Sequence, residues 1–256
     1  MAPQLRPGAV PAAIIFALAG LNHQVSTSPM ENLAFTVSVW VLPVLIAVTF
    51  HEAAHGWVAW RLGDDTAYRL GRVTFNPLSH IDLFGTILLP ALMLFASGGR
   101  MVFGFAKPVP VNFAGLGHPR RDMVLGAPAG PGPNLLLAVI SAALIHLLPM
   151  LSGDVYQWAG HNLINSMRIN LLLCVFNMLP MPPLDGGRVA VGLLPNPLSR
   201  RLARLERAGI AIILVAMFIL PWIGGKIGVD LNVFWWLVGV PTEYLMEIVF
   251  TMTGHL

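Results

Sequence analysis

The chain has 256 residues, of which 56% are hydrophobic and only 11% are charged, and its mean hydropathy is +0.72. These values exclude an ordinary soluble domain and indicate an integral protein of the lipid bilayer. The formal net charge of +3 comes from basic residues between apolar segments, without interleaved aromatic residues. This pattern indicates membrane topology, and we expect no nucleic-acid partner.

The first 30 residues form an N-terminal segment of uncertain role. Arg6 precedes an apolar stretch, as in a signal peptide, but no clear cleavage site follows. We expect a short, uncleaved, membrane-associated segment over residues 9–21, and Met30 is an alternative natural start.

Apolar runs suited to membrane-spanning helices follow along the chain. They predict an all-α polytopic membrane protein with five to six transmembrane helices, in one membrane-embedded domain over residues 1–256. Glu243 and Glu247 leave open whether the last run crosses completely. The runs cover residues 34–57, 124–149, 160–180, 207–223 and 231–252, with a shorter run at 83–97.

The run at 83–97 has only 15 residues with Pro90 at its centre, whereas a spanning helix needs about 20. We count the lysines and arginines other than Arg6 and Arg168. If the run does not cross, twelve of them lie on one side of the membrane and one on the other; if it crosses, the division is nine to four. Because basic residues gather on the cytoplasmic side, we expect this run to enter the membrane without spanning it.

Two short stretches between the first two long runs differ from the helical pattern. Residues 68–76 and 100–112 are rich in Val and Phe and are bounded by Gly, Pro and Asn. This composition predicts a small β-hairpin or sheet at the membrane surface.

The motif His51-Glu52-Ala53-Ala54-His55 ends the first long run. On a helix, positions i and i+4 share a face, so both histidines can bind one metal ion, with Glu52 beside the remaining coordination position. A catalytic zinc ion needs a third protein ligand. Asp185 is the best candidate, because aspartate is otherwise absent from the predicted spans and the surrounding prolines and glycines give it a stiff turn.

The predicted topology also brings these residues to one side of the membrane. His51 and His55 lie at the cytoplasmic end of 34–57, and Asp185 follows 160–180, so an even number of crossings must separate them. The runs 124–149 and 160–180 provide two crossings if 83–97 does not cross. The metal site and the basic residues therefore favour the same topology.

Three motifs in this order resemble the site-2 protease family of intramembrane zinc metalloproteases, in its compact form without a PDZ domain. They are HEAAH at 51–55, GPGPN at 130–134 and NMLPMPPLDGG at 177–187, and the likeness covers residues 34–223. The resemblance implies one zinc ion per chain, with His51, His55 and Asp185 as ligands and Glu52 as general base. Asn134 and Asn177 match positions that hold the substrate or polarise its carbonyl; alternatively, each closes a hydrogen bond between helices.

The resemblance further implies regulated intramembrane proteolysis of single-span membrane proteins. The enzyme would lie in a bacterial-type cytoplasmic membrane with its site towards the cytoplasm. A strand edge at 73–75 or 102–105 could bind the substrate in extended form, or the hairpin could be self-contained. A divalent-metal transporter and an inactive, helix-binding homologue are alternative functions, and the natural substrate and oligomeric state stay open.

Overall fold

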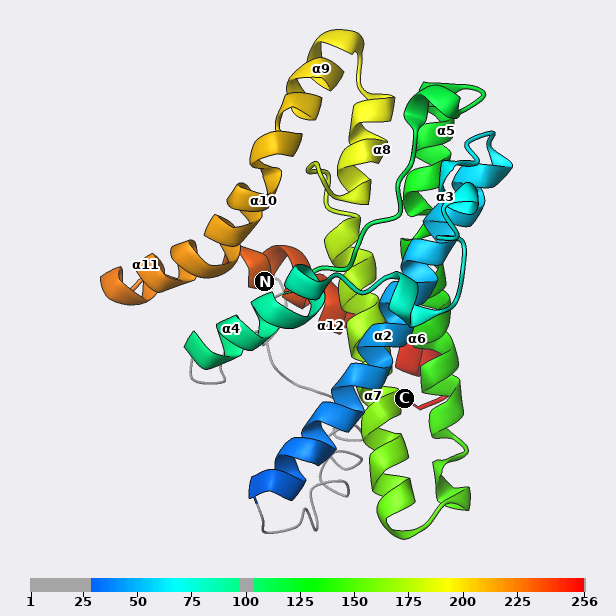
Figure 1. Ribbon diagram of the computed structural model, residues 1–256. Helices are drawn as coiled ribbons and strands as arrows, with labels where there is room; N and C mark the ends of the chain where they lie inside the picture. The colour runs from blue at the N-terminus through cyan, green and yellow to red at the C-terminus, as the bar shows by residue number, and fades with distance from the viewer. Residues whose placement is uncertain (1–28, 97–103, 256) are drawn as a thin grey trace.

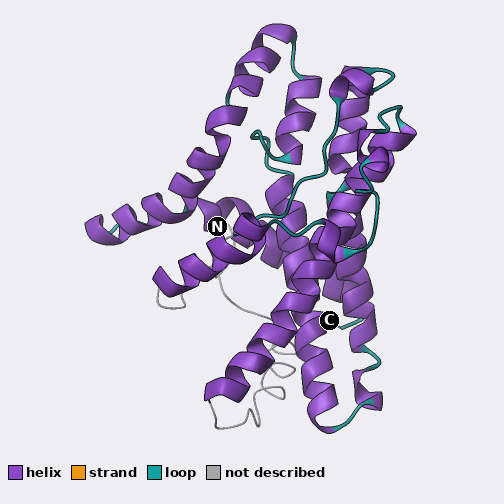
Figure 2. Cartoon of the chain, viewed as in Figure 1, coloured by secondary structure: helices purple, strands orange, loops and turns teal. Residues whose placement is uncertain are grey.

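The computed structural model describes residues 29–96 and 104–255, and the N-terminal segment expected at 9–21 lies outside them. The described parts are helices joined by loops (Figure 2). In chain order, with η marking short 3-10 or π-helical segments, the elements are α2 (Pro29–Arg61), α3 (Thr66–Arg69), η1 (Pro77–Ser79), η2 (Leu83–Leu88), α4 (Leu89–Ala96), η3 (Phe113–Gly115), α5 (Pro119–Gly126), η4 (Ala127–Ala129), α6 (Pro131–Ile145), η5 (Leu148–Met150), α7 (Gly153–Asn177), α8 (Asp185–Leu193), α9 (Asn196–Arg204), α10 (Glu206–Leu214), η6 (Val215–Ile219), α11 (Leu220–Ile227), η7 (Trp235–Gly239) and α12 (Val240–Met252).

Three helical stretches among the described residues are long and apolar enough to cross a membrane. They are Ala34–Arg61, Pro119–Ile145 and Glu206–Ile227. The helix α7 is also long, with 25 residues, but it contains four asparagines that lower its hydropathy. An all-helical membrane protein is thus confirmed, whereas the full number of five to six crossings stays a prediction.

The apolar run expected to enter without spanning forms η2 and α4. Asp82 caps its start, where its carboxylate accepts the backbone N–H groups of Phe84 and Gly85. From Leu83 to Ala96 this helix is about 21 Å long at 1.5 Å per residue. It is therefore shorter than the hydrocarbon core of a bilayer, which is about 30 Å thick.

The predicted β-hairpin is wrong for the residues that the structure describes, since neither 68–76 nor 104–112 contains a strand. The loop 104–112 instead contacts the region before α4, where the backbone N–H of Lys107 donates to the carbonyl oxygen of His80. Val73 and Val109 pack on α2, at 3.0 and 3.2 Å from where a Cβ on Gly56 would lie. The valine-rich pattern reflects this packing on a helix, and not strand pairing.

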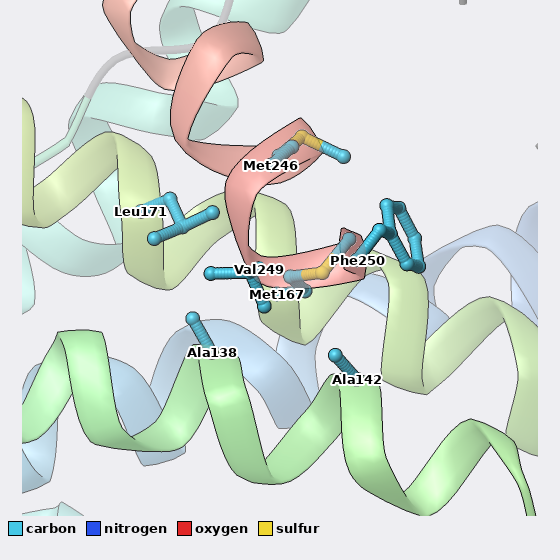
Figure 3. Packing of buried hydrophobic residues seen from close by; sticks show 7 residues of the cluster. All are labelled: Ala138, Ala142, Met167, Leu171, Met246, Val249 and Phe250. Atoms are coloured by element: carbon cyan, nitrogen blue, oxygen red, sulfur yellow. The ribbon is translucent and has the colours of Figure 1, made fainter. Parts of the chain in front are cut away.

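The centre of the molecule is a helix bundle in which α2, α6 and α7 pack against one another, with α12 on α6 and α7 (Figure 1). Its core contains small residues from α6 facing large ones from the other helices (Figure 3). Small residues allow helices in a membrane to approach closely. The core residues are Ala138, Ala142, Met167, Leu171, Met246, Val249 and Phe250.

The close approach of α6 and α7 predicts that Ala138→Leu destabilises the protein. Ala138 has no exposed surface, so the added atoms must overpack the core, at a cost of about 1–3 kcal/mol. Thermal unfolding in detergent measures the effect. The exposed Ala143 on the same helix is the matched control. An equal loss of stability for Ala143→Leu would contradict the close packing of α6 at Ala138.

Candidate metal centre

The two histidines of the opening motif lie on one face of α2. The Nε2 atoms of His51 and His55 are 3.2 Å apart, and both side chains are buried. Their spacing of four residues brings the two rings together because one turn of an α-helix separates them. The sequence-predicted pair is therefore oriented towards a common point.

Asp185 reaches the same point from the first residue of α8. Its Oδ2 atom lies 3.1 Å from Nε2 of His55 and 3.3 Å from Nε2 of His51. The turn before it is tightly packed, since a Cβ on Gly186 would lie 2.1 Å from the carbonyl oxygen of Met178. Arg120 on α5 holds the other end of α8 by donating to the carbonyl oxygen of Gly192 at 2.8 Å.

The donor set and its spacing fit a zinc ion. Two imidazole nitrogens and a carboxylate oxygen are typical zinc ligands, and bonds of 2.0–2.1 Å in tetrahedral geometry place such donors about 3.3 Å apart. Gly130 provides the necessary space, because a Cβ there would lie 2.4 Å from Nε2 of His55 and 2.5 Å from Nε2 of His51. Among the described residues, no other group of three His, Cys, Asp or Glu has this geometry.

Each histidine is also held at its other ring nitrogen. The Nδ1 atom of His51 lies 2.7 Å from Oδ1 of Asn134, and that of His55 lies 3.2 Å from the carbonyl oxygen of Gly126. Both partners are acceptors, so each Nδ1 carries a proton and each Nε2 is the nitrogen available to a metal. Such outer contacts typically orient metal-binding histidines.

Asp185 is held in its ionised form. Burial by itself raises its pKa, but hydrogen bonds and charge interactions with His51 and His55 outweigh burial and hold the pKa well below its usual range. Arg188, one turn along α8, places Nη1 3.6 Å from Oδ1 of Asp185. An ionised carboxylate is the form that binds a metal.

Glu52 lies beside the histidines and contacts the loop that replaces the predicted hairpin. Its Oε2 atom accepts the backbone N–H of Val109 at 2.7 Å. This hydrogen bond fixes the loop 104–112 next to the candidate metal site. The contact joins residues 57 positions apart, and nothing in the local sequence indicates it.

The two asparagines of the family motifs lie in different surroundings. Asn134 is completely buried and contacts His51, as described above. Asn177 is half-buried and donates to the carbonyl oxygen of Leu173 in its own helix at 3.0 Å. Their substrate-binding role stays a prediction. Asn170 was not singled out from the sequence, although it contacts Asn134 at 2.8 Å; an amide within an apolar run is the signal that could have found it.

The close approach of Gly130 to both histidines predicts that Gly130→Ala impairs zinc binding. The new methyl group would push both Nε2 atoms aside, and we expect zinc affinity to fall by about 10- to 100-fold, the range for disturbed ligand orientation. Competition with a chelator measures this. Gly132→Ala is the matched control, because a Cβ there meets no atom within 4 Å; equal affinities of the two variants would contradict the geometry.

Comparisons with known proteins identify relatives of the chain. No family model and no solved structure matches it. YwhC of Bacillus subtilis, named "Putative zinc metalloprotease", is 37% identical over 185 residues, which are 71% of this chain and 80% of YwhC. Rip2 of Mycolicibacterium smegmatis carries the same description and is 30% identical over 71% of this chain and 68% of its own length.

A third relative with that description, MJ0611 of Methanocaldococcus jannaschii, is 33% identical over 60% of this chain and 72% of its own length. The matched segments cover most of the length of each relative. The chain also carries a buried His-His-Asp group suited to zinc. The chain therefore belongs to the site-2 protease family of zinc metalloproteases.

Proposed function

We propose that the protein is an endopeptidase that uses one zinc ion to hydrolyse peptide bonds within the transmembrane segments of single-span membrane proteins. The observation that carries this proposal is the convergence of His51, His55 and Asp185 on one point at the end of an apolar helix. His51 lies about 15 Å along α2 from its end at Arg61, at 1.5 Å per residue. A substrate bond cleaved there would lie below the membrane surface.

The zinc ion would be held by Nε2 of His51, Nε2 of His55 and Oδ2 of Asp185. When bound, zinc supplies Lewis acidity towards a peptide carbonyl and towards a water molecule. The two imidazoles contribute neutral nitrogen donors, because Asn134 and Gly126 accept their Nδ1 protons. Asp185 contributes one negative charge, which lowers the net charge of the loaded site to about +1.

Glu52 acts as the general base. Its carboxylate takes a proton from the water that attacks the peptide carbonyl, and returns a proton to the amide nitrogen as the C–N bond breaks. The second proton of water passes from the new carboxyl group to the amine, so the products are a carboxylate and an ammonium group and Glu52 ends in its starting form. The N–H of Val109 holds one carboxylate oxygen and limits the rotation of the side chain.

The distribution of basic residues supports a location in a cytoplasmic membrane, with the site towards the cytoplasm. With 83–97 not crossing, and Arg6 and Arg168 left aside, twelve lysines and arginines fall on the side that carries the end of α2 and the start of α8, and one falls on the other. Positively charged loops are retained on the cytoplasmic side. The protease would then release its product into the cytoplasm.

Glu52→Gln should bind as much zinc as the wild type and lose cleavage. The amide cannot take the proton of water, so we expect the rate to fall by about 10²–10⁴-fold, while the three ligands stay in place. Purified proteins are incubated with a panel of single-span substrates, and zinc content is measured alongside cleavage.

The exposed Glu206, at the start of α10, provides the control variant Glu206→Gln, which should cleave normally. Full cleavage by Glu52→Gln would rule out the proposed role of Glu52. Zinc uptake into vesicles that depends on His51, without cleavage by the wild type, would instead favour a metal transporter.

The proposed topology predicts the side from which cysteines are labelled. In a Cys174→Ser background, which removes the single cysteine, Ser152→Cys should react with an impermeant maleimide from outside the cell. Ala203→Cys should react only in inverted membranes. Both positions are exposed, so access depends on the side of the membrane, and the reverse pattern would overturn the orientation.

A further inference from the structure

A chain of buried amides connects the candidate metal site to α7. Asn134 and Asn170 have no exposed surface. Besides its contact with His51, Asn134 donates from Nδ2 to the carbonyl oxygen of Ala47 at 3.1 Å and to Oδ1 of Asn170 at 2.8 Å. Asn170 in turn donates from Nδ2 to the carbonyl oxygen of Ser166 at 2.8 Å. The amide groups thus link α2, α6 and α7.

The directions of these hydrogen bonds are determined by groups that can only accept. The carbonyl of Ser166 must receive a proton, so Asn170 presents its Nδ2 to Ser166 and its Oδ1 to Asn134. Asn134 must then present its Nδ2 to Asn170 and to Ala47. Rotating the Asn134 amide by half a turn would place its oxygen against two other oxygens, in a region that water does not reach.

The orientation of the Asn134 amide determines the protonation of Nδ1 in His51, a proposed metal ligand. With its Nδ2 directed away, Asn134 presents only Oδ1 to His51. An amide oxygen cannot donate, so Nδ1 of His51 must carry a proton, and Nε2, which faces Asp185 and His55, is the nitrogen that remains for a metal. The proton on Nδ1 of His51 thus follows from two backbone carbonyls, that of Ala47 in α2 and that of Ser166 in α7.

We propose that Asn170, acting through Asn134, is a positioning residue that sets the tautomer and ring orientation of His51 for zinc binding. The proposal rests on the proposed function in one respect, namely that His51 binds the metal. It assigns to Asn170 a role in zinc affinity, although no contact joins Asn170 to the metal ligands.

A merely structural role for Asn170 can be separated from this one by a second asparagine of α7. Asn165 is also buried, and it donates from Nδ2 to the carbonyl oxygen of Val39 in α2 at 3.0 Å. It therefore closes the same kind of hydrogen bond between α7 and α2. Its acceptor, Val39, lies twelve residues before His51 along α2. Its amide has no connection to the candidate metal site.

The test compares Asn170→Leu, Asn170→Asp and Asn165→Leu in the full-length protein. Leucine at 170 removes one of the two acceptors that orient Asn134 and leaves only the carbonyl of Ala47. We expect zinc affinity to fall about tenfold, the lower end of the range for lost outer contacts. Aspartate with a protonated carboxyl group keeps both the acceptor and the donor, and should restore affinity. Asn165→Leu should stay within about twofold of the wild type.

Two readouts are used: zinc dissociation constants from chelator competition, and the position of the His51 proton in the metal-free protein from ¹⁵N NMR of labelled histidines, assigned with a His51→Gln variant. In the wild type we expect a proton on Nδ1, and in Asn170→Leu a partial loss of that proton. Equal losses for Asn170→Leu and Asn165→Leu, or no change in affinity and tautomer for Asn170→Leu, would overturn the proposal.

The two proposals can fail separately. If the wild type binds no zinc, the proposed function fails, whereas the tautomer measurement on the metal-free protein still tests the role of Asn170. If Asn170→Leu yields no folded protein, Asn170→Ala removes the same acceptor with a smaller side chain and is measured in its place.

Discussion

The two imidazole nitrogens and the carboxylate oxygen of the candidate metal site are separated by only 3.1, 3.2 and 3.3 Å. Polar and charged groups are costly to bury in an apolar bundle unless each has a partner. On the outer side of the site the partners are the amide of Asn134, the carbonyl of Gly126 and the guanidinium of Arg188. On the inner side the proposed zinc ion would complete the compensation, which connects the burial of this cluster with the proposed catalysis.

This polar arrangement depends on the apolar packing around it. Asn134 contacts His51 only because α6 lies against α2, and α6 is held there by its alanines against α7 and α12 (Figure 3). Gly130, at the start of α6, lets the same helix approach both Nε2 atoms without occupying the space between them. The small residues of α6 therefore serve both helix packing and the metal site.

The reactive side of the site is built differently, from loops and short helices. Asp185 is positioned by a proline-rich turn and by α8, and Glu52 contacts the loop 104–112 through Val109. Irregular backbone at this depth is tolerated where it lines a water-containing region, and hydrolysis requires water. The helices α4 and α11 extend away from the bundle (Figure 1). A half made of long helices, which holds His51 and His55, thus adjoins a half made of loops and short helices, which holds Asp185.

The sequence by itself determined the membrane class, the shared face of His51 and His55 and the candidacy of Asp185, because these follow from composition, helical periodicity and the rarity of aspartate in apolar runs. It misled on the β-hairpin, since valines that pack a loop on a helix alternate much as those of a strand do. Only the tertiary structure decided the partner of Asn134, the link to Asn170 and the space at Gly130. These contacts join residues 83 and 36 positions apart, and they depend on how each helix is rotated about its axis, which hydropathy does not encode.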